Sequence, residues 1–191
     1  MAVAMAQVAQ HYGLPCYVNV GLSDSKQVDA QSGLERGMTL LMGALAGADT
    51  FGHTGIAGAD QAASLEQLIV DDAMAAYVKR ILRGFAVNEE TTALEVIKRV
   101  GIGGNFLADR HTVTLFRREL WSPDLFDRRD WQSWWEAGAK TMVQVAREKK
   151  QRILSQHSPE PIDPALAREI DGIVAAARRE LTATEWCPRH A

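Results

Sequence analysis

The sequence has 191 residues, of which 47% are hydrophobic and 24% are charged, close to the average for soluble globular proteins. This length is enough for one domain with a substantial core. The formal net charge is −3, from 21 basic and 24 acidic residues, and no basic block stands apart. The composition therefore disfavours extensive disorder and a nucleic-acid partner held by general electrostatics.

Two cysteines, Cys16 and Cys187, lie at opposite ends of the sequence, and neither has a neighbour at metal-ligand spacing. We expect two reduced thiols and no metal site. The first residues lack the basic region of a signal peptide, and no apolar run is long enough to span a bilayer. These features predict a cytoplasmic protein with no membrane partner.

The first third of the sequence alternates helical and strand patterns. A helix is predicted over 2–12, a buried strand over 15–20, a helix over about 33–46 and a second short strand near 50–53. The segment 33–46 is apolar nearly all round, so we expect that helix to be well buried.

The remaining segments predict helices only. Ser64 is a suitable N-cap for a helix that ends near Gly84, with Asp71 and Asp72 on its polar face. Further helices are predicted over 88–100, 111–120, 129–155 and 164–181, the last opened by Asp163 and Pro164. A break at 158–161 divides the chain into a domain over 1–157 and a C-terminal helix and tail over 158–191.

The connection between the first strand and the helix that follows is unusually long and polar. It runs for roughly eleven residues, whereas an ordinary connection of this kind has two to six. It carries Asp24, Lys26, Asp29 and Gln31 after the carboxyl end of a strand, where α/β folds usually place their chemistry. The alternative is a self-bonded connection, with Asp24 capping a turn and Lys26 paired with Asp29.

Several spaced motifs resemble a known family. Ser23-Asp24-Ser25-Lys26 and the segments 29–33, 101–107, 111–112, 116–123 and 125–129 are similar, in this order, to the signatures of trimethylamine methyltransferases of the MttB type. The resemblance covers roughly residues 1–182. It implies an α/β chain that is the helix-rich C-terminal part of a (β/α)8 TIM barrel, with a helical C-terminal tail.

The resemblance also implies a reaction. These enzymes transfer a methyl group from a tertiary or quaternary amine, such as trimethylamine or glycine betaine, to the Co(I) of a corrinoid. A separate protein carries that cofactor, so no cofactor is expected to bind this chain directly. Because no pyrrolysine is written here, the sequence resembles the non-pyrrolysine, glycine-betaine-methyltransferase-like branch. The cobalt is the nucleophile, so no side chain is assigned a catalytic role.

Substrate-binding candidates follow from the loop and the resemblance together. The loop offers both carboxylates for an ammonium group and cationic or amide donors for a substrate carboxylate. Phe51 and His53 are expected at the same barrel mouth, although a lone histidine is more often structural. The full set of substrate-binding candidates is Asp24, Lys26, Asp29, Gln31, Phe51, His53 and His111.

Other conspicuous residues receive structural interpretations. The glycine-rich loop 101–104 lacks the spacing of a dinucleotide or phosphate-binding motif. Trp131, Trp134 and Trp135 have helical spacing, which favours core packing over an aromatic cage. Arginines at 117, 118, 128 and 129 are expected in ion pairs on a solvated face, with a docking surface for the corrinoid protein as the alternative.

A second hypothesis from a different class remains open. A barrel without its early strands has exposed sheet edges and an incomplete mouth. The chain would then be a truncated, non-catalytic scaffold that associates with a corrinoid protein or a separately encoded half-barrel. Exposed edges and a tryptophan-rich helix also favour association into homo-oligomers.

Overall fold

The computed structural model describes residues 1–183 and divides the chain into two compact units, residues 1–154 and a second unit that begins at Ser155. The second unit holds α9 (Pro164–Ala183). The first unit holds α1 (Ala2–His11), β1 (Tyr17–Val18), α2 (Ala30–Leu45), β2 (Thr50–Phe51), β3 (Ile56–Ala57), β4 (Ala62–Ala63), α3 (Leu65–Arg83), α4 (Glu89–Thr92), α5 (Leu94–Val100), α6 (Arg110–Glu119), α7 (Trp131–Glu136) and most of α8 (Met142–Gln156).

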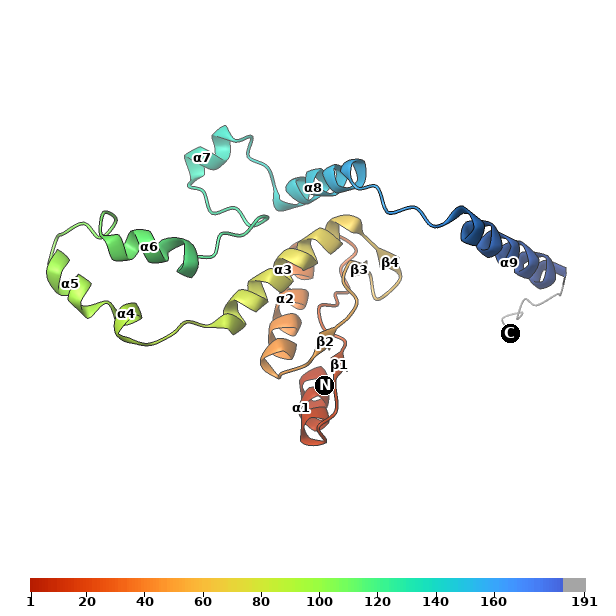
Figure 1. The fold of residues 1–191 in the computed structure, drawn as a ribbon, viewed down its shortest axis with the longest axis horizontal. Helices are drawn as coiled ribbons and strands as arrows, with labels where there is room; N and C mark the ends of the chain where they lie inside the picture. The colour runs from red at the N-terminus through yellow and green to blue at the C-terminus, as the bar shows by residue number, and fades with distance from the viewer. Residues whose placement is uncertain (184–191) are drawn as a thin grey trace. The chain divides into compact units, whose positions relative to one another are not determined.

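The centre of the first unit is a β1–α2–β2 crossover. β1 and β2 are parallel, with Tyr17 opposite Thr50 and Val18 opposite Phe51. Parallel neighbours require a crossover connection, which α2 supplies. Figure 1 shows α2 and α3 side by side, with α1 next to the start of β1. The fold is therefore helix-rich α/β, as predicted, with each of these strands shorter than the predicted span.

Two separate apolar clusters hold these elements. Ala6 of α1 packs with Cys16, Val18 and Val20, and Phe51 closes the cluster from β2. Cys16 is a free, buried thiol, whereas Cys187 lies outside the described residues.

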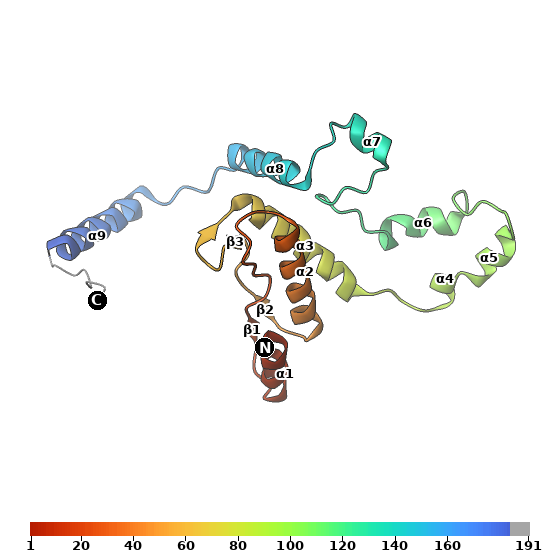
Figure 2. The same cartoon turned by 180° about the vertical axis from the view of Figure 1, so that it is seen from behind.

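The second cluster joins α3 to α8. Val70 packs with Leu125 and Ala146, and Lys150 Nζ lies 2.6 Å from Glu66 Oε1 across the same contact. Figures 1 and 2, which view the chain from opposite sides, both place α8 beside α3. Burial and charge pairing therefore act together at this contact.

The prediction that the helix after the polar loop is well buried is wrong. Leu34, Met38, Met42 and Leu45 of α2 are all more than half exposed. Strands β1 and β2, α1 and α3 cover part of α2, and within residues 1–183 nothing comparable covers the opposite face. Apolar residues around a helix predict burial only if a partner exists for each face.

Two predicted helices are each broken in two. Ala93, with φ of 52°, separates α4 from α5 inside the predicted helix 88–100. In the predicted helix 129–155, Gly138 and Ala139 have φ of 96° and 50°, and α7 ends before them. A left-handed backbone cannot continue an α-helix, and alanine gives little sign of it in a sequence.

This second break explains why the tryptophans do not enter a core. Trp131 and Trp135 are 73% and 62% exposed, and their rings stack on each other with centroids 6.4 Å apart. The Trp134 indole nitrogen donates to the Lys140 carbonyl oxygen at 3.1 Å. The core packing predicted for these side chains is therefore wrong for Trp131 and Trp135.

The loop that precedes α3 contains a short antiparallel pair, β3 and β4, which the sequence does not predict. Among residues 1–183, no helix has the length and apolar character that crossing a membrane requires.

Two glycines in α2 test how closely the helix approaches the strands. A Cβ at Gly43 would lie 3.1 Å from Val20 Cγ1 and 3.2 Å from Phe51 Cε1, whereas a Cβ at Gly37 would meet nothing within 4 Å. Gly37→Ala should therefore raise the free energy of unfolding by about 0.5–1 kcal/mol. Gly43→Ala should lower it by about 1–2 kcal/mol, because two packed side chains must move.

Denaturant unfolding of both variants measures this difference. Because the two substitutions are chemically identical and share one helix, helix propensity cancels between them. Equal stabilisation by both would contradict the close contact.

Candidate functional site

The polar loop after β1 is anchored on one carboxylate of α2. Glu35 Oε2 accepts from the Ser23 hydroxyl at 2.7 Å and from the Asp24 backbone N–H at 3.1 Å. Its other oxygen accepts from the Gln31 amide at 3.0 Å. These donors hold the pKa of Glu35 below its ordinary value, with the Ser23 hydroxyl as the main cause. The first half of the loop is thus fixed to the first turns of α2.

The second half of the loop is held by Asp29, the N-cap of α2. Asp29 Oδ1 accepts from the Ser32 backbone N–H at 2.8 Å and from the Ser25 hydroxyl at 2.9 Å. The Ser32 N–H, followed by the Ser25 hydroxyl, lowers the pKa of Asp29. Capping of this kind explains why α2 begins at Ala30, before Gly33.

Beneath the loop lies a buried polar network centred on an ion pair. Arg36 Nη1 lies 2.9 Å from Asp71 Oδ2, and both side chains are almost fully buried. Arg36 Nη1 also donates to the Gly21 carbonyl oxygen at 2.7 Å, and Nη2 donates to the Ile56 carbonyl oxygen. One side chain of α2 therefore joins the end of the β1 region to the start of β3.

The same network extends into α3. Asp71 accepts from the Gly55 N–H at 2.7 Å and from the Gln67 amide at 2.7 Å. Gln67 in turn accepts from the Ser32 hydroxyl at 2.8 Å. Burial raises the pKa of Asp71, while these two donors and Arg36 oppose the shift. No buried side-chain nitrogen or oxygen in the described part of the chain lacks a partner.

This network corrects the prediction for Asp71, which was expected on the polar face of its helix together with Asp72. Asp71 is buried and Asp72 is exposed. The sequence did hold a signal for the network. Gln67 and Asp71 are four residues apart on one helix, as are Ser32 and Arg36 on the other, so each pair lies on one helical face.

A second group of side chains gathers at the carboxyl ends of β1 and β2. His53 Nε2 lies 3.0 Å from Asn19 Oδ1, and His53 Nδ1 lies 3.9 Å from Asp60 Oδ1. His53 has φ of 68°, a left-handed conformation that histidine adopts more readily than most residues. The imidazole is thus held between an amide and a carboxylate on a constrained backbone.

Tyr17 supplies an aromatic ring to this group. Its ring centroid lies 6.3 Å from that of His53, and Tyr17 is more than half exposed. The ring crosses Gly52 so closely that a Cβ at that position would lie 1.6 Å from the Tyr17 oxygen. Only glycine leaves room for this placement. Tyr17, Asn19 and Asp60 are not among the residues that the sequence predicts for a site, because their grouping depends on strand pairing and on the β3–β4 turn.

The structure separates the predicted site residues into sets. Asp24 is exposed, and within residues 1–183 its carboxylate has no hydrogen-bond partner. Lys26 does not pair with Asp29, because its Nζ donates instead to the Asp24 carbonyl oxygen at 2.8 Å. Phe51 packs into the first core cluster, away from the solvent-facing ring of Tyr17. His111 contacts neither group: its Nε2 lies 2.7 Å from the Glu90 carbonyl oxygen, and its N–H is capped by Asp109.

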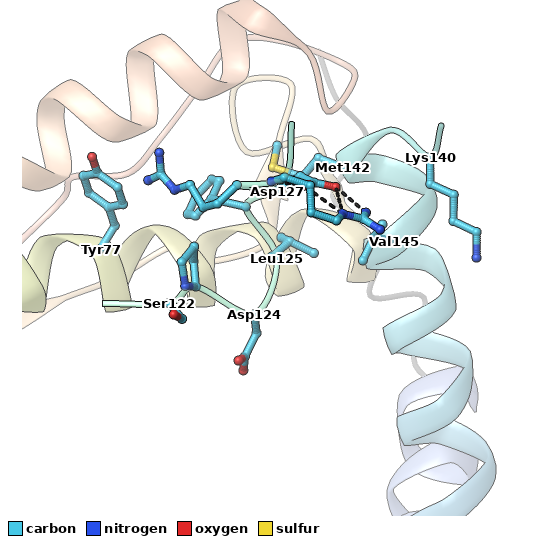
Figure 3. Close-up of a pocket in the computed structure, with 12 residues that line it drawn as sticks. Tyr77, Ser122, Asp124, Leu125, Asp127, Lys140, Met142 and Val145 are labelled. Carbon is cyan, nitrogen blue, oxygen red and sulfur yellow. Dashed lines mark hydrogen bonds and ion pairs between the residues drawn. The ribbon is translucent and has the colours of Figure 1, made fainter. Parts of the chain in front are cut away.

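A cavity of about 670 Å³ lies elsewhere, between α3, the segment 122–129 and the start of α8, and Figure 3 shows the side chains around it. Asp127 is paired with Arg129, which lowers the pKa of that carboxyl to about 2, and Lys140 is paired with Glu148 at 2.8 Å. The lining of this cavity contains none of the seven predicted substrate-binding residues.

The predicted arginine pairs are found in part. Arg118 pairs with Glu119 at 2.7 Å and with Glu90 at 3.3 Å, and Arg129 pairs with Asp127. No ion pair of Arg117 or Arg128 is found within residues 1–183. Over the same range, no three His, Cys, Asp or Glu side chains are grouped so that they could hold a metal ion.

Polar side chains collected at the carboxyl ends of parallel strands define the class of site that α/β enzymes use. The family model for trimethylamine methyltransferase (MTTB) matches residues 1–182. The chain therefore belongs to the trimethylamine methyltransferase family.

Curated relatives agree with this assignment. Over 179 residues the chain is 41% identical to trimethylamine methyltransferase MttB2 of Methanosarcina mazei, which covers 94% of this chain and 36% of that relative. It is 41% identical over 177 residues to trimethylamine methyltransferase MttB of Methanosarcina barkeri, covering 93% of this chain and 36% of the relative. It is also 36% identical over 179 residues to the glycine betaine methyltransferase of Desulfitobacterium hafniense, covering 93% and 37%. The chain thus spans little more than a third of the length of these relatives.

The buried ion pair can be tested by an isosteric change. Asp71→Asn should lower the free energy of unfolding by about 3 kcal/mol, because Arg36 would remain buried without its counter-charge. Asp72→Asn, one residue along and exposed, should change it by less than about 0.5 kcal/mol. Denaturant unfolding measures both, and similar losses in the two variants would contradict a buried pair.

The loop should also become less stable in acid. Because folding lowers the pKa of both Asp29 and Glu35 from ordinary values of 3.8 and 4.5, their stabilising contribution is complete above those values. It is lost as the pH falls through the lower folded-state values. The melting temperature should therefore fall between about pH 5 and pH 3, and less steeply in Asp29→Asn/Glu35→Gln.

Asparagine caps a helix about as well as aspartate, so this double variant should keep most of its stability at neutral pH. Parallel melting-temperature profiles for the variant and the parent chain would exclude these two carboxylates as the origin of the acid sensitivity.

Proposed function

We propose that the protein containing this chain transfers a methyl group from a tertiary or quaternary amine to the Co(I) of a corrinoid held by a separate cytoplasmic protein. The observation that carries the proposal is the family match over residues 1–182, on a chain whose polar side chains gather at the ends of two parallel strands. The corrinoid protein is the methyl acceptor, a second substrate whose cobalt supplies the nucleophile.

The amine would lie at the carboxyl ends of β1 and β2. A quaternary ammonium group has no proton to donate, so it is bound by aromatic faces and nearby carboxylates. Tyr17 offers an exposed ring, and Asp24 and Asp60 offer exposed carboxylates. His53, oriented by Asn19, and the amide of Gln31 are suited to hold an anionic end of a substrate such as a betaine carboxylate.

The remaining candidates have supporting roles in this proposal. Lys26 and Asp29 fix the course of the loop, and Phe51 fixes β2 against the core. His111 would join the site only if α6 approaches the strand ends in the complete enzyme. Closure of these strands into a (β/α)8 barrel belongs to the same proposal.

A second candidate function is supported by the length of the chain, which spans little more than a third of its relatives. A β1–β2 pair has two unpaired edges within residues 1–183, which further strands could extend. The chain by itself would then be a non-catalytic scaffold that binds a corrinoid protein or a separately encoded half-barrel.

A methyl-transfer assay separates the two candidates. The chain is mixed with reduced corrinoid protein and with glycine betaine, carnitine, proline betaine or trimethylamine, and methylation is followed by the absorbance of the corrinoid. We expect little turnover from this chain alone and methylation by one amine when the remaining segments of a family member are supplied. Methylation of the corrinoid by the chain alone would refute the scaffold hypothesis. If neither mixture methylates the corrinoid, the methyltransferase proposal is refuted.

The site itself is tested with a matched pair of histidines in the active mixture. His53→Asn keeps a residue that tolerates the left-handed backbone but removes the imidazole. It should lower kcat/KM at least tenfold, about 1.4 kcal/mol of transition-state stabilisation. His157→Asn, on an exposed segment, should leave the rate unchanged.

A further inference from the structure

The C-terminal helix α9 has a continuous apolar stripe. At 100° per residue, Leu166, Ile170, Ile173, Val174 and Leu181 fall within a sector of about 100°. All five are exposed, with Ile173 at 63%. A 20-residue helix is about 30 Å long, so the stripe is a long apolar surface within the second unit.

The pattern of the stripe is almost the same when it is read from either end. Ile173 and Val174 lie at the centre, Leu166 and Leu181 lie at equal distances on the two sides, and Ile170 has Ala177 as its counterpart. A self-complementary surface is what a two-fold symmetric, antiparallel contact requires, because each half of one helix meets the other half of its partner.

Charges beside the stripe favour the same orientation. Asp171 and Arg178 are seven residues apart, so they lie on the same flank of the stripe, two turns from each other. Both are exposed, and neither forms an ion pair within residues 1–183. In an antiparallel pair whose two-fold axis lies between Ile173 and Val174, Asp171 of each copy comes level with Ala176 of the other, about 3 Å along the axis from Arg178, an offset that the long arginine side chain can span. A parallel pair would instead place Asp171 beside Glu169.

The segment before α9 carries two prolines among mostly polar residues. Residues 157–163 are exposed and contain Pro159 and Pro161, which favour an extended spacer.

We propose that α9 is a self-association helix: two copies of this chain pair antiparallel through the apolar stripe, with reciprocal Asp171–Arg178 ion pairs at its edge. The contact is independent of the proposed methyl transfer. Because one helix from each copy buries less surface than a standard protein interface, we expect a reversible dimer with a dissociation constant in the micromolar range, about 1–100 µM.

Sedimentation velocity of the whole chain at several concentrations tests the pairing. Ile173→Asp should abolish the dimer, because it places a charge at the centre of the stripe. Asp171→Arg and Arg178→Asp should each weaken it about tenfold, and the combined swap should restore it to within about threefold. Arg179→Asp, on the opposite face of α9, is the matched control and should leave the dimer unchanged. Circular dichroism checks that each variant keeps its helix content.

Cross-linking tests the orientation. In a Cys187→Ser background, Ile170→Cys and Ala177→Cys are made separately, and a short bismaleimide joins cysteines that face each other. Antiparallel pairing should cross-link a mixture of the two variants far more than either variant alone. A monomer at every concentration, a dimer that Ile173→Asp leaves intact, or cross-linking of each variant with itself would overturn the proposal.

Discussion

The ion pair between Arg36 and Asp71 is the interaction on which the first unit depends. It joins α2 to α3, and through Gly21, Gly55 and Ile56 it also fixes the two loops that follow β1 and β2. Taking two charges out of water is costly, and the cost is offset only where every donor and acceptor is paired. Here all are paired, so the network specifies one arrangement of the loops more than it adds stability.

The consequence for function is that the loops beside the strand ends are fixed to α2 and α3 by this buried network. Glu35 and Asp29 accept their hydrogen bonds from the loop and the first turn of α2, and the exposed carboxylate of Asp24 has no hydrogen-bond partner among residues 1–183. His53 and Tyr17 are placed by strand pairing and by the absence of a side chain at Gly52. Side chains placed in this way can hold a small ligand in one orientation.

The exposed apolar residues have a different meaning in different places. On α2 they face away from β1 and β2, in a chain that spans little more than a third of its relatives' length. On α9 they form a narrow, nearly symmetric stripe bordered by opposite charges, a pattern suited to a second copy. Trp131 and Trp135 stack on each other, and both remain more than half exposed.

The sequence by itself determined the family, the α/β class, the positions of α1, α3, α6 and α9, and the presence of a long polar loop after β1, whereas the substrate-binding residues stay a prediction. These depend on local periodicity, capping residues and motif order. Only the tertiary structure decided that Asp71 is buried against Arg36, that Asn19, Asp60 and Tyr17 join His53, and that Trp131 and Trp135 stay exposed. Each of these outcomes depends on contacts between distant segments or on left-handed backbone at alanine, aspartate or histidine, which leave no periodic signal in the chain.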